Sequence, residues 1–466
     1  MLAVLFCGVL LAALDIAITG PALPAFREAF ALAPRSAAWV FNVFVLFNLV
    51  GVPLTTRWAD RVGRRTVFAA SVATFGAGAL VVALAPSFSV VLAGRAVQGA
   101  AASGIFPAAS AMVGDTVPAD RRGRALGILG AVYGLAFLIG PALAGVVLGV
   151  AHWRWLYGLV VPFTVLVAAV AWRMLPPTQA ARPETVDGRG IVTLGLTLAA
   201  LAYGVNQVDA VAPLRSLLQL DVGGLIVAAG VGAVLFVRFE RRAVDPLLRL
   251  DLFRNRQIVL ASLLGIGAGI AEATFIFFSD LAVAAFAVPK STASYMLMPL
   301  VAAVAFGAPV AGRVLDRVGS RAIALSGMGL LTLGLAAIAL RPAARIVFYG
   351  GSVTLGLGLA CLLGSALSYI LLQEAQEAER TVVQGLNTMA LGVGQLLGGA
   401  LIGAVAASAP GVTGYAQAFG VVAVVGACGT ALALGLRKRA ATQDQPDGPH
   451  EKTNAERRRK DQNQRA

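Results

Sequence analysis

The sequence has little charge for its length. Only 13% of its 466 residues are charged, 58% are hydrophobic, and the mean hydropathy is +0.81. Soluble domains carry about 25% charged residues. A soluble core of this size could not bury so much apolar surface, so lipid must solvate part of it. The composition therefore excludes an ordinary soluble protein.

Histidine and cysteine are also scarce, with two histidines and three cysteines. Cys7, Cys361 and Cys428 all lie in apolar runs without C-x-x-C spacing, which is typical of small buried hydrophobic residues. The sequence has no GxxxxGK[ST] phosphate loop, no nucleophile–base pair and no metal-ligand cluster. It therefore predicts no cofactor, no bound metal and no enzyme activity.

Long apolar runs, in contrast, fill most of the chain. A bilayer core takes about 20 apolar residues of helix to cross, and fourteen such runs are present. The first eight are Met1–Leu23, Ala37–Leu54, Thr66–Ala85, Phe88–Val113, Ala125–Val150, Leu156–Trp172, Ile191–Val208 and Leu220–Val237. The last six are Ile258–Val283, Thr292–Ala311, Ala322–Leu340, Ile346–Ile370, Val382–Ala407 and Tyr415–Leu436. The sequence thus predicts an all-α polytopic membrane protein with 14 transmembrane helices.

Lysine and arginine are distributed unevenly between the two sides of these spans. With both termini on one side, 29 of the 37 basic residues lie on that side, 7 lie on the other, and Arg95 lies within a span. Because basic loops stay in the cytoplasm, we expect cytoplasmic termini in the inner (plasma) membrane. This bias also explains the net charge of +14 without nucleic acid as a partner. The basic tail, 438–466, is predicted to be disordered.

An internal repeat divides the chain. Residues 57–65 read RWADRVGRR and residues 313–321 read RVLDRVGSR, which are identical at six of nine positions and 256 residues apart. Each copy follows the second span of a six-span block. Internal duplication is a common origin of transporters whose central site lies between the halves.

The repeat resembles the signature of the major facilitator superfamily, G-x-L-x-D-x-x-G-R-[RK]. The matching positions are Asp60, Gly63, Arg64 and Arg65 in the first copy and Asp316, Gly319 and Arg321 in the second. Leu92-x-x-Arg95-x-x-Gln98-Gly99 is similar to the second motif of that family, and Gly140-Pro141-x-x-x-Gly145 is similar to its antiporter motif. Leu14-Asp15, Trp153-Arg154-Trp155 and Asp245-Pro246 resemble the fourteen-span drug:proton antiporter branch, although Ala17, Gly20 and Val160 depart from it.

This resemblance implies a major facilitator fold. Two six-helix bundles, 1–175 and 257–437, would be related by a pseudo-two-fold axis, and two extra central spans would lie in 176–256. The halves would rock so that a central cavity opens alternately to each side. We expect a monomer whose partners are a small-molecule substrate, protons and the lipid bilayer.

Three charged residues lie deep inside predicted spans, where charge is costly and usually functional. At 1.5 Å per residue, Asp15, Arg95 and Glu272 fall at a similar depth. The apolar surroundings of Glu272 favour its neutral form, so it is the predicted proton carrier, assisted by Asp15 and Arg95. A neutral structural Glu272 and a static Asp15–Arg95 salt bridge are the alternatives. Asp15, Gln98, Glu272 and Phe275 are predicted to line the substrate cavity.

Other motif residues have predicted mechanical roles. Asp60, Gly63, Arg64, Arg65, Asp316, Gly319 and Arg321 form a predicted conformational latch between the halves; simple positive-inside anchoring is the alternative for the arginines. Gly140 and Pro141 are predicted to break the helical hydrogen-bond ladder, and the resemblance implies a role with Gly145 in blocking leak; a plain packing kink is the alternative. Asp221 and Asp280 are predicted to be solvated near the outer surface. For the phenylalanines at positions 41, 44, 47, 275, 277 and 278, packing or lipid contact is favoured over an aromatic cavity.

The combined prediction is a proton-coupled antiporter that exports hydrophobic, cationic drugs or toxic compounds. An exporter of a neutral or anionic metabolite, such as a sugar, amino acid or pigment, is the first alternative. A membrane sensor that does not transport is the second, and the duplicated latch motif disfavours it because a scaffold needs no alternating gate.

Overall fold

The computed structural model is all α-helical and describes residues 1–177, 188–209, 211–243, 250–374 and 380–437. The N-terminal helices are α1 (Leu2–Ala29), α2 (Pro34–Ala37), α3 (Trp39–Val62), α4 (Arg64–Ala83), α5 (Phe88–Thr116), α6 (Ala119–Val150), α7 (Arg154–Gly158) and α8 (Val160–Met174). The next are α9 (Gly188–Gln207), α10 (Pro213–Leu217), α11 (Leu220–Glu240), the 3-10 helix η1 (Leu250–Arg254), α12 (Arg256–Glu272), α13 (Thr274–Phe286) and α14 (Lys290–Met296). The last are α15 (Met298–Val318), α16 (Ser320–Leu340), α17 (Arg345–Cys361), the π-helix η2 (Leu362–Ala366), α18 (Leu367–Glu374), α19 (Arg380–Ala407) and α20 (Val412–Ala433).

Most of these helices are suited to a bilayer. Among the described residues, twelve helical segments are long and apolar enough to cross a membrane, and Gly134–Val150 and Arg345–Cys361 are shorter apolar helices. The structure is therefore that of a multi-pass membrane protein. The predicted span Ile258–Val283 is divided into α12 and α13 by a break at Ala273, directly after Glu272.

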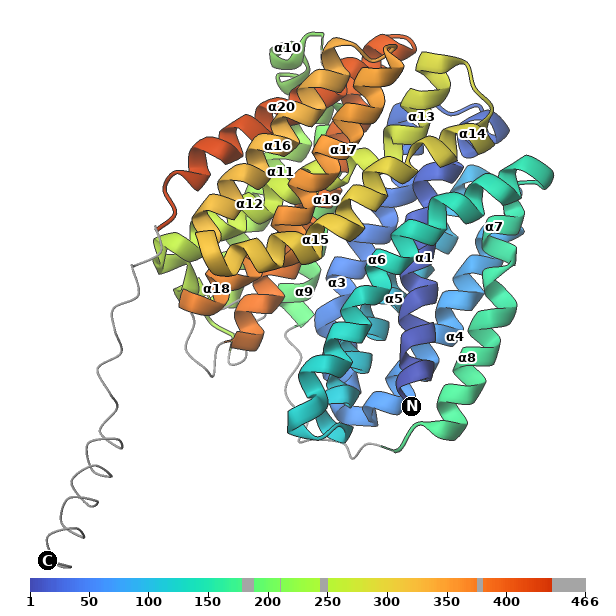
Figure 1. Cartoon of the computed structure of the whole chain (residues 1–466), viewed down its shortest axis with the longest axis vertical. Helices are drawn as coiled ribbons and strands as arrows, with labels where there is room; N and C mark the ends of the chain where they lie inside the picture. The colour runs from blue at the N-terminus through green and yellow to red at the C-terminus, as the bar shows by residue number, and fades with distance from the viewer. Residues whose placement is uncertain (178–187, 210, 244–249, 375–379, 438–466) are drawn as a thin grey trace, which may run out of the picture.

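The helices form two groups and a bridging pair (Figure 1). In the first group, α1, α3, α4, α5, α6 and α8 pack on one another; in the second, α12 and α13 pack with α15–α20. Helix α9 packs against both α3 and α19 and so contacts both groups, and α11 packs on α9. We call the end of the assembly that holds Met1 the N-face and the opposite end the far face. The two groups converge toward the far face and diverge toward the N-face in Figure 1.

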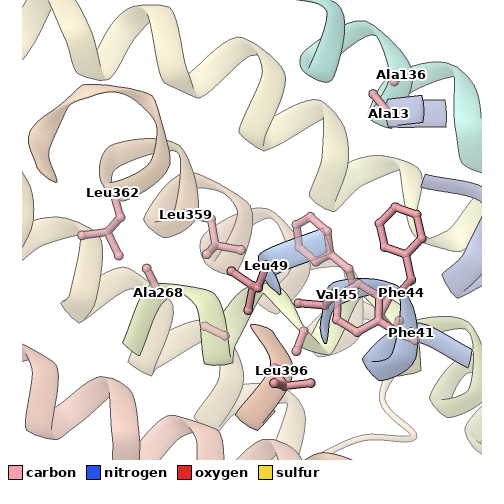
Figure 2. Close-up of a cluster of buried hydrophobic side chains, with 14 of the residues drawn as sticks. Ala13, Phe41, Phe44, Val45, Leu49, Ala136, Ala268, Leu359, Leu362 and Leu396 are labelled. Carbon is pink, nitrogen blue, oxygen red and sulfur yellow. The ribbon is translucent and has the colours of Figure 1, made fainter. Parts of the chain in front are cut away.

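Close packing of α3 against α19 joins the two groups. In Figure 2 the α3 side chains Phe41, Val45 and Leu49 lie in one buried cluster with Leu396 of α19. A Cβ at Gly392 of α19 would lie 2.5 Å from Leu49 Cδ2, so the two helices approach closely because this position is glycine. Lipid provides no hydrophobic driving force between helices, so this close packing is what holds them together.

Asn206 fastens α9 to both groups near the far face. Its side chain is buried. Trp39 Nε1 donates a hydrogen bond to Asn206 Oδ1 at 3.1 Å, and Asn206 Nδ2 donates to the Arg35 and Ala400 carbonyl oxygens at 3.2 and 3.3 Å. The extra helix pair is thus anchored where α3 meets α19.

The two copies of the sequence repeat form the same turn. Gly63 joins α3 to α4 with φ 91° and ψ 143°, and Gly319 joins α15 to α16 with φ 83° and ψ 161°. L-amino acids with a side chain rarely adopt this backbone conformation. Both turns therefore depend on glycine, as the repeat predicts for Gly63.

We expect Gly319→Ala to lower the thermal unfolding midpoint of the detergent-solubilised protein, because a positive φ costs a non-glycine residue about 1–3 kcal/mol. Gly329→Ala is the matched control, since a Cβ at this position of α16 meets open space. Equal midpoints for the two variants would show that the turn tolerates a side chain.

Candidate functional site

Asp15 of α1 and Arg95 of α5 form a buried ion pair, and both side chains are fully buried. Gln98 Nε2 donates to Asp15 Oδ1 at 2.7 Å, Arg95 Nη1 donates to Gln98 Oε1 at 2.9 Å, and Arg95 Nε donates to the Val40 carbonyl oxygen at 2.9 Å. Nearly every polar atom of the pair is therefore satisfied inside the protein, as lipid requires.

Aromatic rings surround this pair. The guanidinium carbon of Arg95 lies 4.5 Å from the centre of the Phe44 ring and 5.9 Å from that of Tyr157. The Tyr157 hydroxyl is 3.4 Å from that of Thr19. This low-polarity shell strengthens the attraction between the two charges and makes the loss of either partner costly.

A separate small cavity lies where the two groups meet. Its lining is mostly apolar and aromatic, from both groups: Ile16, Ala17, Gly20, Pro21, Phe41, Phe137, Glu272, Phe275, Ile276, Leu297 and Gln395. Glu272 Oε2 accepts a hydrogen bond from Gln395 Nε2 at 2.9 Å. The rings of Phe137 and Phe275 meet edge to face across the groups, with centroids 5.9 Å apart.

The predicted cavity residues divide between these two places. Glu272 and Phe275 line the cavity, but Asp15 and Gln98 do not, because their polar atoms are turned toward Arg95. The predicted lining role of those two residues therefore stays a prediction. The sequence prediction missed Gln395 and Phe137, which no motif marks.

The six phenylalanines singled out from the sequence have different surroundings. Phe41 joins Phe275 in the cavity lining. Phe44 lies over Arg95, whereas Phe47 is exposed on the helix surface. Phe277 and Phe278 are fully buried in the core of the second group. An aromatic cavity therefore exists, but most of the predicted phenylalanines serve packing.

The Gly140-Pro141 motif packs closely and does not interrupt its helix, since α6 is continuous from Ala119 to Val150 with Pro141 inside it. Pro141 has no backbone N–H, so the hydrogen-bond ladder lacks one bond there although the helix continues. A Cβ at Gly140 would lie 2.5 Å from Ala17 Cβ on α1, and a Cβ at Gly145 would lie 2.6 Å from the Tyr295 ring of α14. The motif therefore lets α6 approach both its own group and the second one.

The latch residues lie at the N-face. Arg64 Nη1 donates to the Ala111 carbonyl oxygen at 3.0 Å, and Arg65 Nη1 donates to that of Leu175 at 3.4 Å. These two bonds stay within the first group, at the ends of α5 and α8. The side chains of Asp60 and Asp316 lie outside the part of the chain that the structure describes, so their latch role stays a prediction, as does that of Arg321.

At the far face, two ion pairs join the groups. Arg27 Nη1 lies 3.2 Å from Asp280 Oδ2, and Lys290 pairs with Glu28. Asp280 is only 2% exposed, so the prediction that it is solvated was wrong. Asp221, in contrast, is exposed, in line with its prediction.

Membrane-spanning helices in two groups, a mostly apolar cavity with one carboxyl at their junction and a duplicated turn motif define a polytopic membrane transporter. The model of the Major Facilitator Superfamily matches residues 5–289 and 261–462. An uncharacterised MFS-type transporter of Bacillus subtilis, YfiU, is 31% identical over 396 residues, which cover 84% of this chain and 76% of the relative. The chain therefore belongs to the major facilitator superfamily.

Other relatives and solved structures agree with this assignment. The multidrug resistance protein Stp of Mycobacterium tuberculosis is 27% identical over 416 residues, which cover 86% of this chain and 74% of the relative. The human organic anion transporter MFSD10 superposes with a TM-score of 0.62 at 18% identity, covering 93% of this chain and 98% of that one. A bacterial homologue of the human lysosomal transporter Spinster superposes with a TM-score of 0.65 at 16% identity, covering 93% and 95%. At these identities, the structures show the fold alone.

We expect Asp15→Asn or Arg95→Gln alone to destabilise the protein strongly, because each leaves one buried charge unpaired at a cost of about 3–5 kcal/mol. The double variant should recover much of that loss. Thermal unfolding midpoints of the four forms complete the double-mutant cycle. Additive losses would contradict a direct interaction between the two charges.

Proposed function

We propose that this chain is a proton-coupled secondary antiporter that exports hydrophobic, cationic compounds. The observation that carries the proposal is the Glu272 carboxyl, which faces a small aromatic cavity between the two groups and has Gln395 as its hydrogen-bond partner. A carboxyl in an apolar site is neutral unless a positive charge lies close to it. Glu272 therefore binds either a proton or a cationic substrate, and this competition is the coupling.

The aromatic lining supports a planar or hydrophobic cation. Phe41, Phe137 and Phe275 line the cavity, and the face of an aromatic ring attracts a cation by about 0.5–2 kcal/mol. The described lining holds no arginine or lysine. An exporter of an anionic metabolite would need such a group, so the lining disfavours that alternative.

Asp15, Arg95 and Gln98 act beside the cavity in this proposal. Asp15 reaches α5 through its ion pair and belongs to α1, whose Ala17 and Gly20 line the cavity. A Cβ at Gly20 would lie 2.8 Å from the Phe275 carbonyl oxygen, so α1 and α13 are in close contact there. If the Asp15–Arg95 pair weakened, α1 would be held less firmly at its contact with α13. A change in the charge of the pair would thus change the conformation.

The proposed mechanism is alternating access by two bundles, 1–175 and 257–437, with the two extra central spans in 176–256 and fourteen spans in all. The N-face is proposed to be cytoplasmic, in the inner membrane, and the far face external. The far-face ion pairs and the contacts of Gly145 and Gly149 with α14 support a state that is closed to the outside. Gly140, Pro141 and Gly145 would seal this side against leak, and the latch residues would close the N-face in the opposite state. We propose that one monomer in the bilayer carries out this cycle.

The names of several relatives also support export of drugs. Stp is called a multidrug resistance protein, and MdtP of Bacillus subtilis, which is 24% identical over 408 residues, is called a multidrug transporter protein. For this chain, both the substrate and the coupling ion are proposals.

The test is ethidium uptake by everted membrane vesicles with an acidic interior. Wild-type uptake should depend on the proton gradient and collapse with a protonophore. Glu272→Gln should abolish it, since this side chain can neither release a proton nor pair with a cation. Asp221→Asn is the matched control and should transport normally, because Asp221 is exposed and is not part of the cavity lining.

Uptake that survives Glu272→Gln but not the protonophore would move the proton site elsewhere, with Asp15 as the next candidate. No ethidium uptake by wild-type protein that is present in the membrane would contradict the drug-exporter proposal.

A further inference from the structure

Three side chains from three helices meet at the far face: Arg27 of α1, Asp280 of α13 and Tyr415 of α20. Arg27 Nη1 lies 3.2 Å from Asp280 Oδ2 and donates to the Tyr415 hydroxyl at 2.6 Å. The Tyr415 hydroxyl donates to Asp280 Oδ2 at 2.8 Å. Arg27 belongs to the first group and the other two residues belong to the second, so this triad joins the groups.

The triad lies beside a pocket of the far face. That pocket has an empty volume of about 780 Å³, and Arg27 and Tyr415 are part of its lining, together with the turn between α19 and α20. Arg27 is 30% exposed, whereas Asp280 is 2% exposed. Water from the far face therefore reaches the triad at Arg27, and Asp280 is the buried partner of Arg27.

The groups that face Asp280 can be identified on each helix that packs against α13, namely α1, α12, α14, α17, α19 and α20. Arg345 of α17 lies over the Phe286 ring, with 5.7 Å between its guanidinium carbon and the ring centre. Arg27 and Tyr415 contact it directly. Glu28 of α1 and Lys290 of α14 pair with each other. Asp15 pairs with Arg95, and Glu272 of α12 bonds to Gln395 of α19. Asp280 therefore depends on Arg27 for a compensating positive charge.

This dependence couples a proton to the opening of the far face. Separation of the two groups removes Arg27 and leaves Asp280 with Tyr415 as its partner within its own group. A buried carboxylate that loses its cation is strongly disfavoured, and a bound proton removes the cost. We propose that Asp280 is a proton-binding site of the far face: as a carboxylate it holds Arg27 and keeps this face closed, and its protonation releases Arg27 and opens the face.

The direction of the effect follows from the number of protons bound. The closed form binds one proton fewer at Asp280 than the open form, so a higher pH at the far face favours closure. Asp280 lies eight positions after Glu272, about 12 Å along the same span. Under the orientation in the proposed function, on which this inference rests, an acidic exterior would open the gate at the moment when Glu272 can exchange its cation for a proton.

Gly149 of α6 and Ser291 of α14 provide a reporter of the closed face. A Cβ at Gly149 would lie 3.7 Å from Ser291 Cβ, across the two groups, and disulfides require Cβ atoms about 3.5–4.5 Å apart. We would introduce Gly149→Cys and Ser291→Cys into a background carrying Cys7→Ala, Cys361→Ala and Cys428→Ala. Oxidative crosslinking of the purified protein in detergent would then be timed from about pH 8 to about pH 5, where free carboxyls begin to titrate.

The comparison is made against the same pair of cysteines with Asp280→Asn, which mimics the protonated side chain. The ratio of the two rates at each pH cancels the pH dependence of thiol chemistry. We expect the Asp280 form to crosslink roughly fivefold faster or more at high pH and the ratio to fall toward one as the pH is lowered. Asp221→Asn in the Asp280 background should leave the rates unchanged.

A ratio that stays constant over this pH range would overturn the proposal. Tyr415→Phe is a second variant, for use also if Asp280→Asn does not fold. It removes a hydrogen bond to the charged carboxylate, so crosslinking should slow at a higher pH than with Tyr415, and an unshifted profile would contradict the role of the triad. This readout needs no transport. A pH-dependent ratio without ethidium export would retain the gate and reject the proposed function, and the reverse result would reject the gate alone.

Discussion

A charge held inside a bilayer must find its partner within the protein, and the arrangement of α1 depends on this constraint. Asp15 in the middle of α1 is neutralised by Arg95, and Arg27 near its far end pairs with Asp280. The first pair fixes α1 to its own group and the second fixes it to the other group. Between them lies Gly20, against the backbone of Phe275. One helix thus carries both attachments and part of the cavity wall.

The two attachments differ in what a change of conformation does to them. Asp15 and Arg95 lie in the same group and are both fully buried, so rocking of the groups leaves them together. Arg27 and Asp280 lie in different groups and must separate if the far face opens. The pair within one group holds α1 in place for as long as both of its members are charged. Separation of the two groups itself breaks the pair between them, so that pair makes the conformation directly sensitive to protons. The Glu272 carboxyl lies in the cavity itself.

Much of the fold follows from the sequence because lipid imposes simple rules. Apolar runs located the membrane helices, and the repeat at Gly63 and Gly319 indicated the duplicated turn. Their similar depth in the bilayer indicated that Asp15 and Arg95 could form a pair. Gln395 and Tyr415 could not be predicted, because they are 123 and 135 residues away from the carboxyls that they bond. Such contacts depend on how helices rotate and pack, which apolar periodicity does not specify. The prediction that Asp280 is solvated failed for the same reason. The position of a residue along its helix gives its depth in the bilayer, but the neighbouring helices determine whether its side chain is buried.

The central claim is that a proton and a cationic substrate compete for Glu272. It is tested most directly by adding ethidium to purified protein in a weakly buffered detergent solution and following both ethidium binding and the pH of the medium. Release of protons in step with ethidium binding, from a pH at which the unliganded carboxyl is neutral, is the expected result. Ethidium binding at that pH without proton release would contradict the claim, since substrate and proton would then occupy the protein independently.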